Sequence, residues 1–257
     1  MNKLAIYLAL LLFSNPTFAN SNLTLKTPRG TNVNVTLHIP SGTNFPLIVV
    51  APGQSCNSKG PIFETLGQMG EAQHYAIIRF EWSYCNVDSG SPNPSENLVN
   101  EIEDFKTVLQ YAKAIPSIDF SKIILAGKSL GSLVAYAVFK NEPSARSLAL
   151  LTPVCTYTTD DNGNPLPEPL RVGEESYPKI KDDSRPILMA MGNQDTLCLL
   201  PALYDFLKDS KGNITTIIGG GGHSLTIKDA SGKLDQEKTQ KNIETLMASL
   251  INWANLN

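Results

Sequence analysis

Residues 125–133 read LAGKSLGSL, and this stretch is compatible with two different folds. Gly127, Lys128 and Ser129 match the end of a phosphate-binding loop, whereas residues 127–131 match G-x-S-x-G, the turn that presents a nucleophilic serine. The phosphate-binding loop also requires a glycine five residues before its second glycine, where this chain has Lys122. Residues 123–126 form an apolar run typical of a strand, which cannot curl around phosphates. We therefore reject the nucleotide-binding interpretation.

The surroundings of Ser129 favour the nucleophile turn. Residues 122–127 predict a buried strand, and residues 129–139 predict a helix that leaves the turn. Glycines two positions before and after the serine remove side chains that would collide in so sharp a turn. The helix N-terminus would also face any negative charge that forms beside the serine. The motif alone is not specific, so the interpretation depends on its partners.

A serine nucleophile needs a base, and the chain contains three histidines. His223 follows the predicted strand 213–219 within GGGGHSL, at the sheet edge where Ser129 is expected. His38 lies in an early strand pair and His74 precedes a strand, so we interpret both as structural or surface residues. His223 is the predicted general base.

The imidazole in turn needs a carboxylate to orient it. Asp195 follows the predicted strand 186–192 by three residues, at the same sheet edge. Competing carboxylates lie in a long connection or before a strand, namely Asp160, Asp161 and Asp183. The order Ser129, Asp195, His223 is one in which such triads occur along a chain. We therefore predict a Ser-His-Asp triad.

Two backbone N–H groups are predicted to stabilise the oxyanion of a tetrahedral intermediate. One belongs to Leu130, directly after the nucleophile. The other is expected in the loop after the predicted strand 46–51, most simply the N–H of Gln54, with Gly53 allowing the substrate to approach the backbone.

The remaining pattern predicts an α/β fold with a mostly parallel sheet and helices on both faces. Eight segments have strand-like apolar or alternating patterns: 23–26, 32–38, 46–51, 76–80, 122–127, 147–154, 186–192 and 213–219. Helical spacing occurs over 61–73, 98–112, 129–139 and a C-terminal segment that includes Ile243 and Trp253. Residues 156–183 are polar, and we expect them to form a cap over a binding cleft within one domain, residues 20–257.

The N-terminal residues 1–19, MNKLAIYLALLLFSNPTFA, predict a signal peptide, with a membrane anchor as the alternative. The protein is therefore expected to be exported, either to the periplasm or as a secreted protein. No other stretch is apolar for long enough to cross a bilayer. A formal net charge of −3 without a concentrated basic face speaks against nucleic-acid binding.

The four cysteines have no spacing typical of metal ligands, so no metal site is predicted. In an exported chain an even number of cysteines indicates two disulfides, and the sequence alone permits three pairings. They are Cys56, Cys85, Cys155 and Cys198.

Five segments give the chain a resemblance to the α/β-hydrolase superfamily over residues 23–255: PLIVVAPGQ, YAIIRFEW, LAGKSLGS, ILMAMGNQD and GGGGHSL. It looks most similar to small bacterial members of the dienelactone-hydrolase-like group. The resemblance implies an eight-stranded, mostly parallel sheet and no cofactor. It also implies the disulfides Cys56–Cys85 and Cys155–Cys198, because the two cysteines of each pair would follow two strands that are neighbours in the sheet.

Two departures from that group concern the active site. Dienelactone hydrolase itself has a cysteine nucleophile, so Ser129 argues against carrying over its substrate. The usual His-Gly of the oxyanion loop is Pro52-Gly53 here, which leaves the role of Gln54 open.

Together these features predict a serine hydrolase that cleaves a small-molecule carboxylic ester through an acyl-enzyme. A peptidase or amidase, or an inactive binding protein with the same fold, are the alternatives. Trp82 and Tyr84 are predicted either to line the acyl or alcohol pocket or to pack against the cap. Lys128 either favours an anionic substrate or is solvated.

Overall fold

The computed structural model describes residues 21–86, 92–160 and 162–257. The predicted signal peptide, Asp161 and the first part of the loop predicted at 89–95 lie outside the described residues. No helix in the described ranges combines the length and apolar character that a bilayer span requires.

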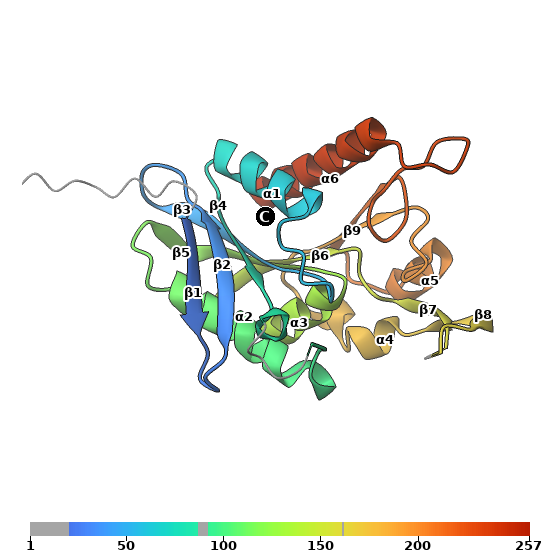
Figure 1. Cartoon of the computed structure of the whole chain (residues 1–257), viewed down its shortest axis with the longest axis horizontal. Helices are drawn as coiled ribbons and strands as arrows, with labels where there is room; N and C mark the ends of the chain where they lie inside the picture. Colours follow the sequence, from blue (N-terminus) through green and yellow to red (C-terminus); the bar gives the residue numbers. More distant parts are fainter. Residues whose placement is uncertain (1–20, 87–91, 161) are drawn as a thin grey trace, which may run out of the picture.

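An eight-stranded sheet forms the centre of the fold, in the order β1-β2-β4-β3-β5-β6-β9-β10 (Figure 1). β1 and β2 form an antiparallel hairpin, and β2 is antiparallel to β4. From β4 onward all neighbouring strands are parallel, which confirms the predicted sheet. The strands are Ser21–Lys26, Asn32–His38, Phe45–Ala51, Ala76–Glu81, Ile118–Lys128, Ala145–Leu151, Ile187–Gly192 and Ile214–Gly219 for β1, β2, β3, β4, β5, β6, β9 and β10.

Helices cover both faces of the sheet, as predicted. α1 (Pro61–Ala72) and α6 (Gln236–Leu256) lie side by side on one face, and α2 (Val99–Ala112) and α3 (Leu130–Phe139) lie on the other (Figure 1). A fifth helix, α5 (Leu200–Leu207), packs on the face of α2 and α3 through Leu203 and Phe206.

The central strands are buried on both sides, because alternate side chains enter two separate apolar cores. In β3, Leu47 and Val49 face the core beneath α2 and α3, whereas Ile48 and Val50 face the core beneath α1 and α6. This explains the continuous apolar run of β3, since a parallel strand covered on both faces has no solvent side.

The segment predicted as a cap forms an antiparallel ribbon of β7 (Thr156–Thr159) and β8 (Pro165–Arg171), followed by the short helix α4 (Gly173–Ser176). The ribbon is a separate sheet and projects from one side of the molecule (Figure 1).

Candidate active site

Ser129 occupies the sharp turn between β5 and α3, with φ 54° and ψ −122°. These dihedrals are unfavourable for a residue with a side chain, and such strain persists only where the surroundings enforce it. Here the Ser129 N–H donates to the Leu151 carbonyl (3.0 Å), and the Ser132 N–H donates to the Ser129 carbonyl (2.8 Å). The turn is therefore fixed from the neighbouring strand and from its own helix.

The two glycines of the motif are required by close packing of the backbone. A Cβ on Gly127 would lie 2.0 Å from the Gly131 carbonyl oxygen, and one on Gly131 would lie 2.4 Å from the Pro52 carbonyl oxygen. Only a hydrogen atom fits at either position.

The side chains of Ser129, His223 and Asp195 form a continuous hydrogen-bonded chain. His223 Nε2 lies 2.8 Å from Ser129 Oγ, and His223 Nδ1 lies 3.0 Å from each carboxylate oxygen of Asp195. Asp195 is only 1% exposed, and its Oδ1 also accepts a hydrogen bond from the Leu197 N–H (2.9 Å). The imidazole is thus within reach of the serine proton on one side and oriented by a buried carboxylate on the other.

The glycine-rich loop that carries His223 is held in place from α6. The Asn242 side chain donates to the carbonyls of Gly220 (3.0 Å) and Leu225 (2.9 Å) and accepts from the Gly220 N–H (2.9 Å). The Gln194 N–H also donates to the Gly221 carbonyl (2.8 Å), which ties this loop to the one that carries Asp195. Asn242 was not predicted from the sequence, because no local motif identifies it.

Tyr177, from the segment predicted as a cap, lies buried beneath the nucleophile turn. Its hydroxyl is 2.7 Å from Ser132 Oγ, which in turn donates to the Ser129 carbonyl, and it accepts from the Val154 N–H (2.9 Å). Burial raises the pKa of the Tyr177 hydroxyl well above its usual value. The segment predicted as a cap therefore also stabilises the nucleophile turn through Tyr177. The sequence of the segment did not indicate this role.

Each predicted oxyanion residue is a chain neighbour of a residue at the nucleophile turn. Leu130 is the first residue of α3, so its N–H has no acceptor within the helix. Gly53, which precedes Gln54, packs against the serine: a Cβ at this position would lie 3.9 Å from Ser129 Oγ.

Trp82 and Tyr84, for which a pocket role and a packing role were both predicted, contact the loop after β3 and are not among the residues that line the cavity beside it. Trp82 is fully buried and its Nε1 donates to the Gly53 carbonyl (3.2 Å). The Tyr84 hydroxyl donates to the Gln54 carbonyl (2.8 Å). Just after β4 the chain passes beneath the loop that follows β3. The side chains of Trp82 and Tyr84 therefore contact that loop from the protein interior.

The same loop has two further attachments. One is the disulfide Cys56–Cys85, and the other is the guanidinium of Arg79, which donates to the Ser58 carbonyl (2.7 Å). Arg79 also donates to His38 Nε2 (3.1 Å), and burial, reinforced by the Arg79 charge, lowers the pKa of His38. His38 therefore has the structural position that the sequence indicated, whereas His74 is exposed.

The second disulfide joins Cys198, in the loop that carries Asp195, to Cys155, in the segment after β6. The two bridges are the pairs that the superfamily resemblance implied. Among the described residues, no group of side chains could hold a metal ion.

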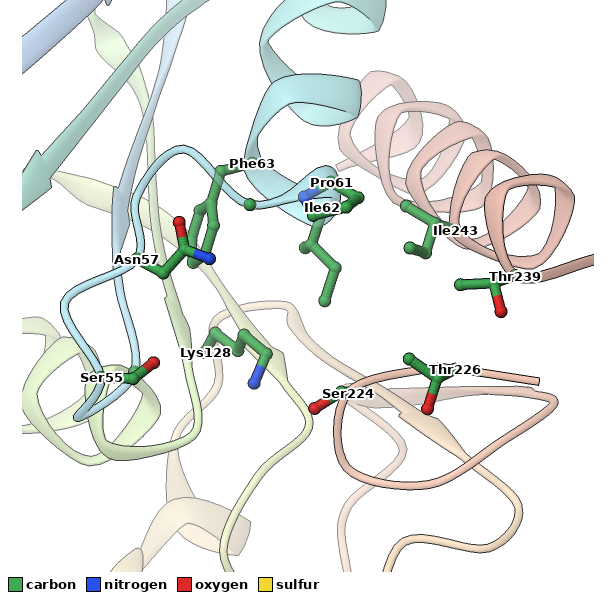
Figure 2. Close-up of a pocket in the computed structure, with 12 residues that line it drawn as sticks. Ser55, Asn57, Pro61, Ile62, Phe63, Lys128, Ser224, Thr226, Thr239 and Ile243 are labelled. Atoms are coloured by element: carbon green, nitrogen blue, oxygen red, sulfur yellow. The ribbon is translucent and has the colours of Figure 1, made fainter. Parts of the chain in front are cut away.

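A cavity of about 200 Å³ lies between the loop after β3, the start of α1, α6 and the segment after His223 (Figure 2). The Lys128 side chain enters this cavity, and burial lowers the pKa of its ammonium group, an effect that the carboxylate of Asp195 opposes. The lining residues are Gly53, Ser55, Asn57, Gly60, Pro61, Ile62, Phe63, Lys128, Ser224, Thr226, Thr239 and Ile243. None of the described residues of 156–183 is among them.

Comparison with known proteins agrees with this architecture. A family profile described as an alpha/beta hydrolase domain matches residues 45–252. One similar solved structure is an alpha-beta serine hydrolase homologue from Coxiella burnetii, with 17% identity and a TM-score of 0.65 over 92% of this chain and 100% of that one. Another is Est1E from Butyrivibrio proteoclasticus, with 17% identity and a TM-score of 0.63 over 90% and 99% of the two chains.

A curated relative, the quorum-quenching protein AidA of Acinetobacter baumannii, is 25% identical over 113 residues. The match covers 44% of this chain and 36% of that protein, so it spans about a third of the relative's length.

Proposed function

Because the chain belongs to the alpha/beta hydrolase family, we propose that it is a serine hydrolase that cleaves a carboxylic ester through an acyl-enzyme. The observation that carries the proposal is the hydrogen-bonded chain from Asp195 through His223 to Ser129. It supplies the nucleophile, the base and the orienting carboxylate that acyl transfer requires.

In the first half-reaction, Ser129 Oγ attacks the ester carbonyl carbon while His223 Nε2 takes the hydroxyl proton. The carbonyl electron pair moves to oxygen, and the resulting oxyanion accepts hydrogen bonds from the N–H groups of Leu130 and Gln54. When the carbonyl re-forms, the bond to the alcohol breaks and His223 gives its proton to the departing oxygen. Water then attacks the acyl-enzyme by the same steps, which releases the acid and restores the Ser129 hydroxyl.

Asp195 keeps the imidazole in the tautomer that this reaction uses. Both of its carboxylate oxygens lie 3.0 Å from Nδ1, and because a carboxylate accepts hydrogen bonds, it favours the ring proton on Nδ1 and leaves Nε2 as the acceptor for the serine proton. The buried carboxylate also stabilises the imidazolium that forms in each half-reaction.

We further propose that the protein is exported after removal of residues 1–19, and that residues 20–257 form one domain. Two disulfides are compatible with an oxidising compartment, and the N-terminal sequence has the pattern of a signal peptide.

Labelling with a fluorophosphonate probe tests the catalytic proposal. We expect a single adduct on Ser129 in the wild-type protein, no adduct in Ser129→Ala, and wild-type labelling in Ser144→Ala, which removes an exposed serine. A folded protein that is not labelled, or an adduct that persists in Ser129→Ala, would favour a hydrolase-fold binding protein. Nitrophenyl esters assayed beside aminoacyl anilides then separate an esterase from a peptidase or amidase.

Replacing Trp82 with phenylalanine is expected to lower kcat for nitrophenyl ester hydrolysis about tenfold, with a smaller change in KM. The variant keeps an aromatic ring next to Phe80 but removes the donor to the Gly53 carbonyl, so the loop that carries the proposed oxyanion donor loosens. Trp253→Phe, a change at another buried tryptophan, in α6, serves as the control. Equal kinetics for the two variants would contradict this role of Trp82.

A further inference from the structure

The cavity that Lys128 enters is directly beside the proposed triad. Two of its lining residues, Lys128 and Ser224, are chain neighbours of Ser129 and His223, and a third, Gly53, packs against the serine. A substrate whose carbonyl lies at Ser129 can therefore place one of its substituents in this cavity.

The lining of the cavity combines one cation with hydroxyl groups and an apolar wall. The hydroxyl groups belong to Ser55, Ser224, Thr226 and Thr239, and the apolar wall includes Ile62, Phe63 and Ile243. No carboxylate is among the lining residues that the structure describes. Figure 2 shows the Lys128 side chain between Ser55 and Ser224, with its nitrogen end towards Ser224.

The ammonium group of Lys128 has no fixed partner within the described part of the chain. None of the hydrogen bonds or ion pairs among residues 21–86, 92–160 and 162–257 involves its Nζ. A partly desolvated cation without a directly bonded counter-charge is costly, and the lowered pKa of the ammonium group reflects that cost even though the more distant Asp195 carboxylate opposes the shift. An anion bound in the cavity would supply the missing partner.

We infer that the natural substrate is an acidic ester, one that bears a small anionic group which binds Lys128 in this cavity. This inference rests on the proposed function and specifies its substrate class. The cavity is smaller than the roughly 300–1,000 Å³ of pockets for drug-sized ligands, so the substituent that carries the anion is short. The hydroxyl groups of Ser55 and Ser224 are available to donate further hydrogen bonds to it.

Matched pairs of esters that differ only in charge test the inference. The mono-4-nitrophenyl ester of adipic acid and its terminal carboxamide probe the acyl side of the substrate, and 4-acetoxybenzoate and 4-acetoxybenzamide probe the alcohol side. For each pair, the measured quantity is the ratio of kcat/KM for the carboxylate to kcat/KM for the carboxamide. Changes that affect the triad or the folded fraction cancel in this ratio.

We expect the wild-type ratio to exceed one for at least one pair, and Lys128→Met to lower that ratio about ten- to hundredfold, the value of a hydrogen bond to a charged group. Lys128→Gln is the second variant if the first does not fold. Lys59→Met is the matched control, because Lys59 is an exposed cation on the loop after β3 that does not line the cavity, and its ratio should equal that of the wild type.

A wild-type ratio of one or less for both pairs overturns the inference, as does a ratio that Lys128→Met leaves unchanged. A protein that the fluorophosphonate probe labels at Ser129 but that hydrolyses none of the four esters also overturns it, while the proposed function stands. A protein that is not labelled overturns the proposed function, and the inference with it.

Discussion

Replacing Ser129 with alanine is expected to lower kcat for ester hydrolysis about 10⁶-fold, and adding His223→Ala to that variant should cost nothing more. The serine hydroxyl and the imidazole act in one step, since His223 Nε2 takes the proton while Ser129 Oγ attacks. Once either group is lost, the other has no remaining function. Asp195→Asn should lower kcat about 10⁴-fold, because an amide does not hold the required tautomer.

These variants are compared by kcat on one nitrophenyl ester, with circular dichroism to verify that each is folded. His74→Ala is the control for the histidine, because His74 is exposed and should retain wild-type activity. If His223→Ala kept more than about 1% of kcat, or if the double variant were much slower than Ser129→Ala, the two residues would not act as one unit.

The sheet could be predicted from the sequence because its parallel strands are buried on both faces. β3 and β5 contain continuous runs of apolar residues, which are typical of strands covered on both faces. Because the strands are parallel, the turns that follow them lie at the same edge of the sheet. The ribbon of β7 and β8 has no such signal, because most of its side chains are exposed and β8 contains three prolines, Pro165, Pro167 and Pro169. α5 was also missed, since it is only eight residues long.

The candidate triad could be predicted because each of its members follows a strand of the parallel sheet. The residues that position the triad could not, because Asn242 and Tyr177 act through hydrogen bonds to segments far away in the sequence. The choice between a pocket role and a packing role for Trp82 and Tyr84 stayed open for a related reason. A residue just beyond a strand can turn towards the cavity or towards the interior, and the interior contacts that decide this lie elsewhere in the chain.

The second large effect concerns the backbone around the nucleophile. Gly127→Ala is expected to lower the free energy of unfolding by at least about 3 kcal/mol, beyond the usual cost of a single substitution. The added Cβ would lie 2.0 Å from the Gly131 carbonyl oxygen, which is a backbone atom and cannot rotate away as a side chain would. β5 and the first turn of α3 would have to separate.

Gly212→Ala provides the matched control for this substitution and makes the test specific to the clash. Gly212 has a φ of +85° with open space around it, so its alanine variant carries only the backbone penalty of about 1–2 kcal/mol. Urea unfolding of both variants, with the disulfides intact, gives the comparison, and equal stabilities would contradict the packing argument. Separation of α3 from β5 would also move the Leu130 N–H away from the substrate. Any folded Gly127→Ala should therefore react with the fluorophosphonate probe much more slowly than folded Gly212→Ala.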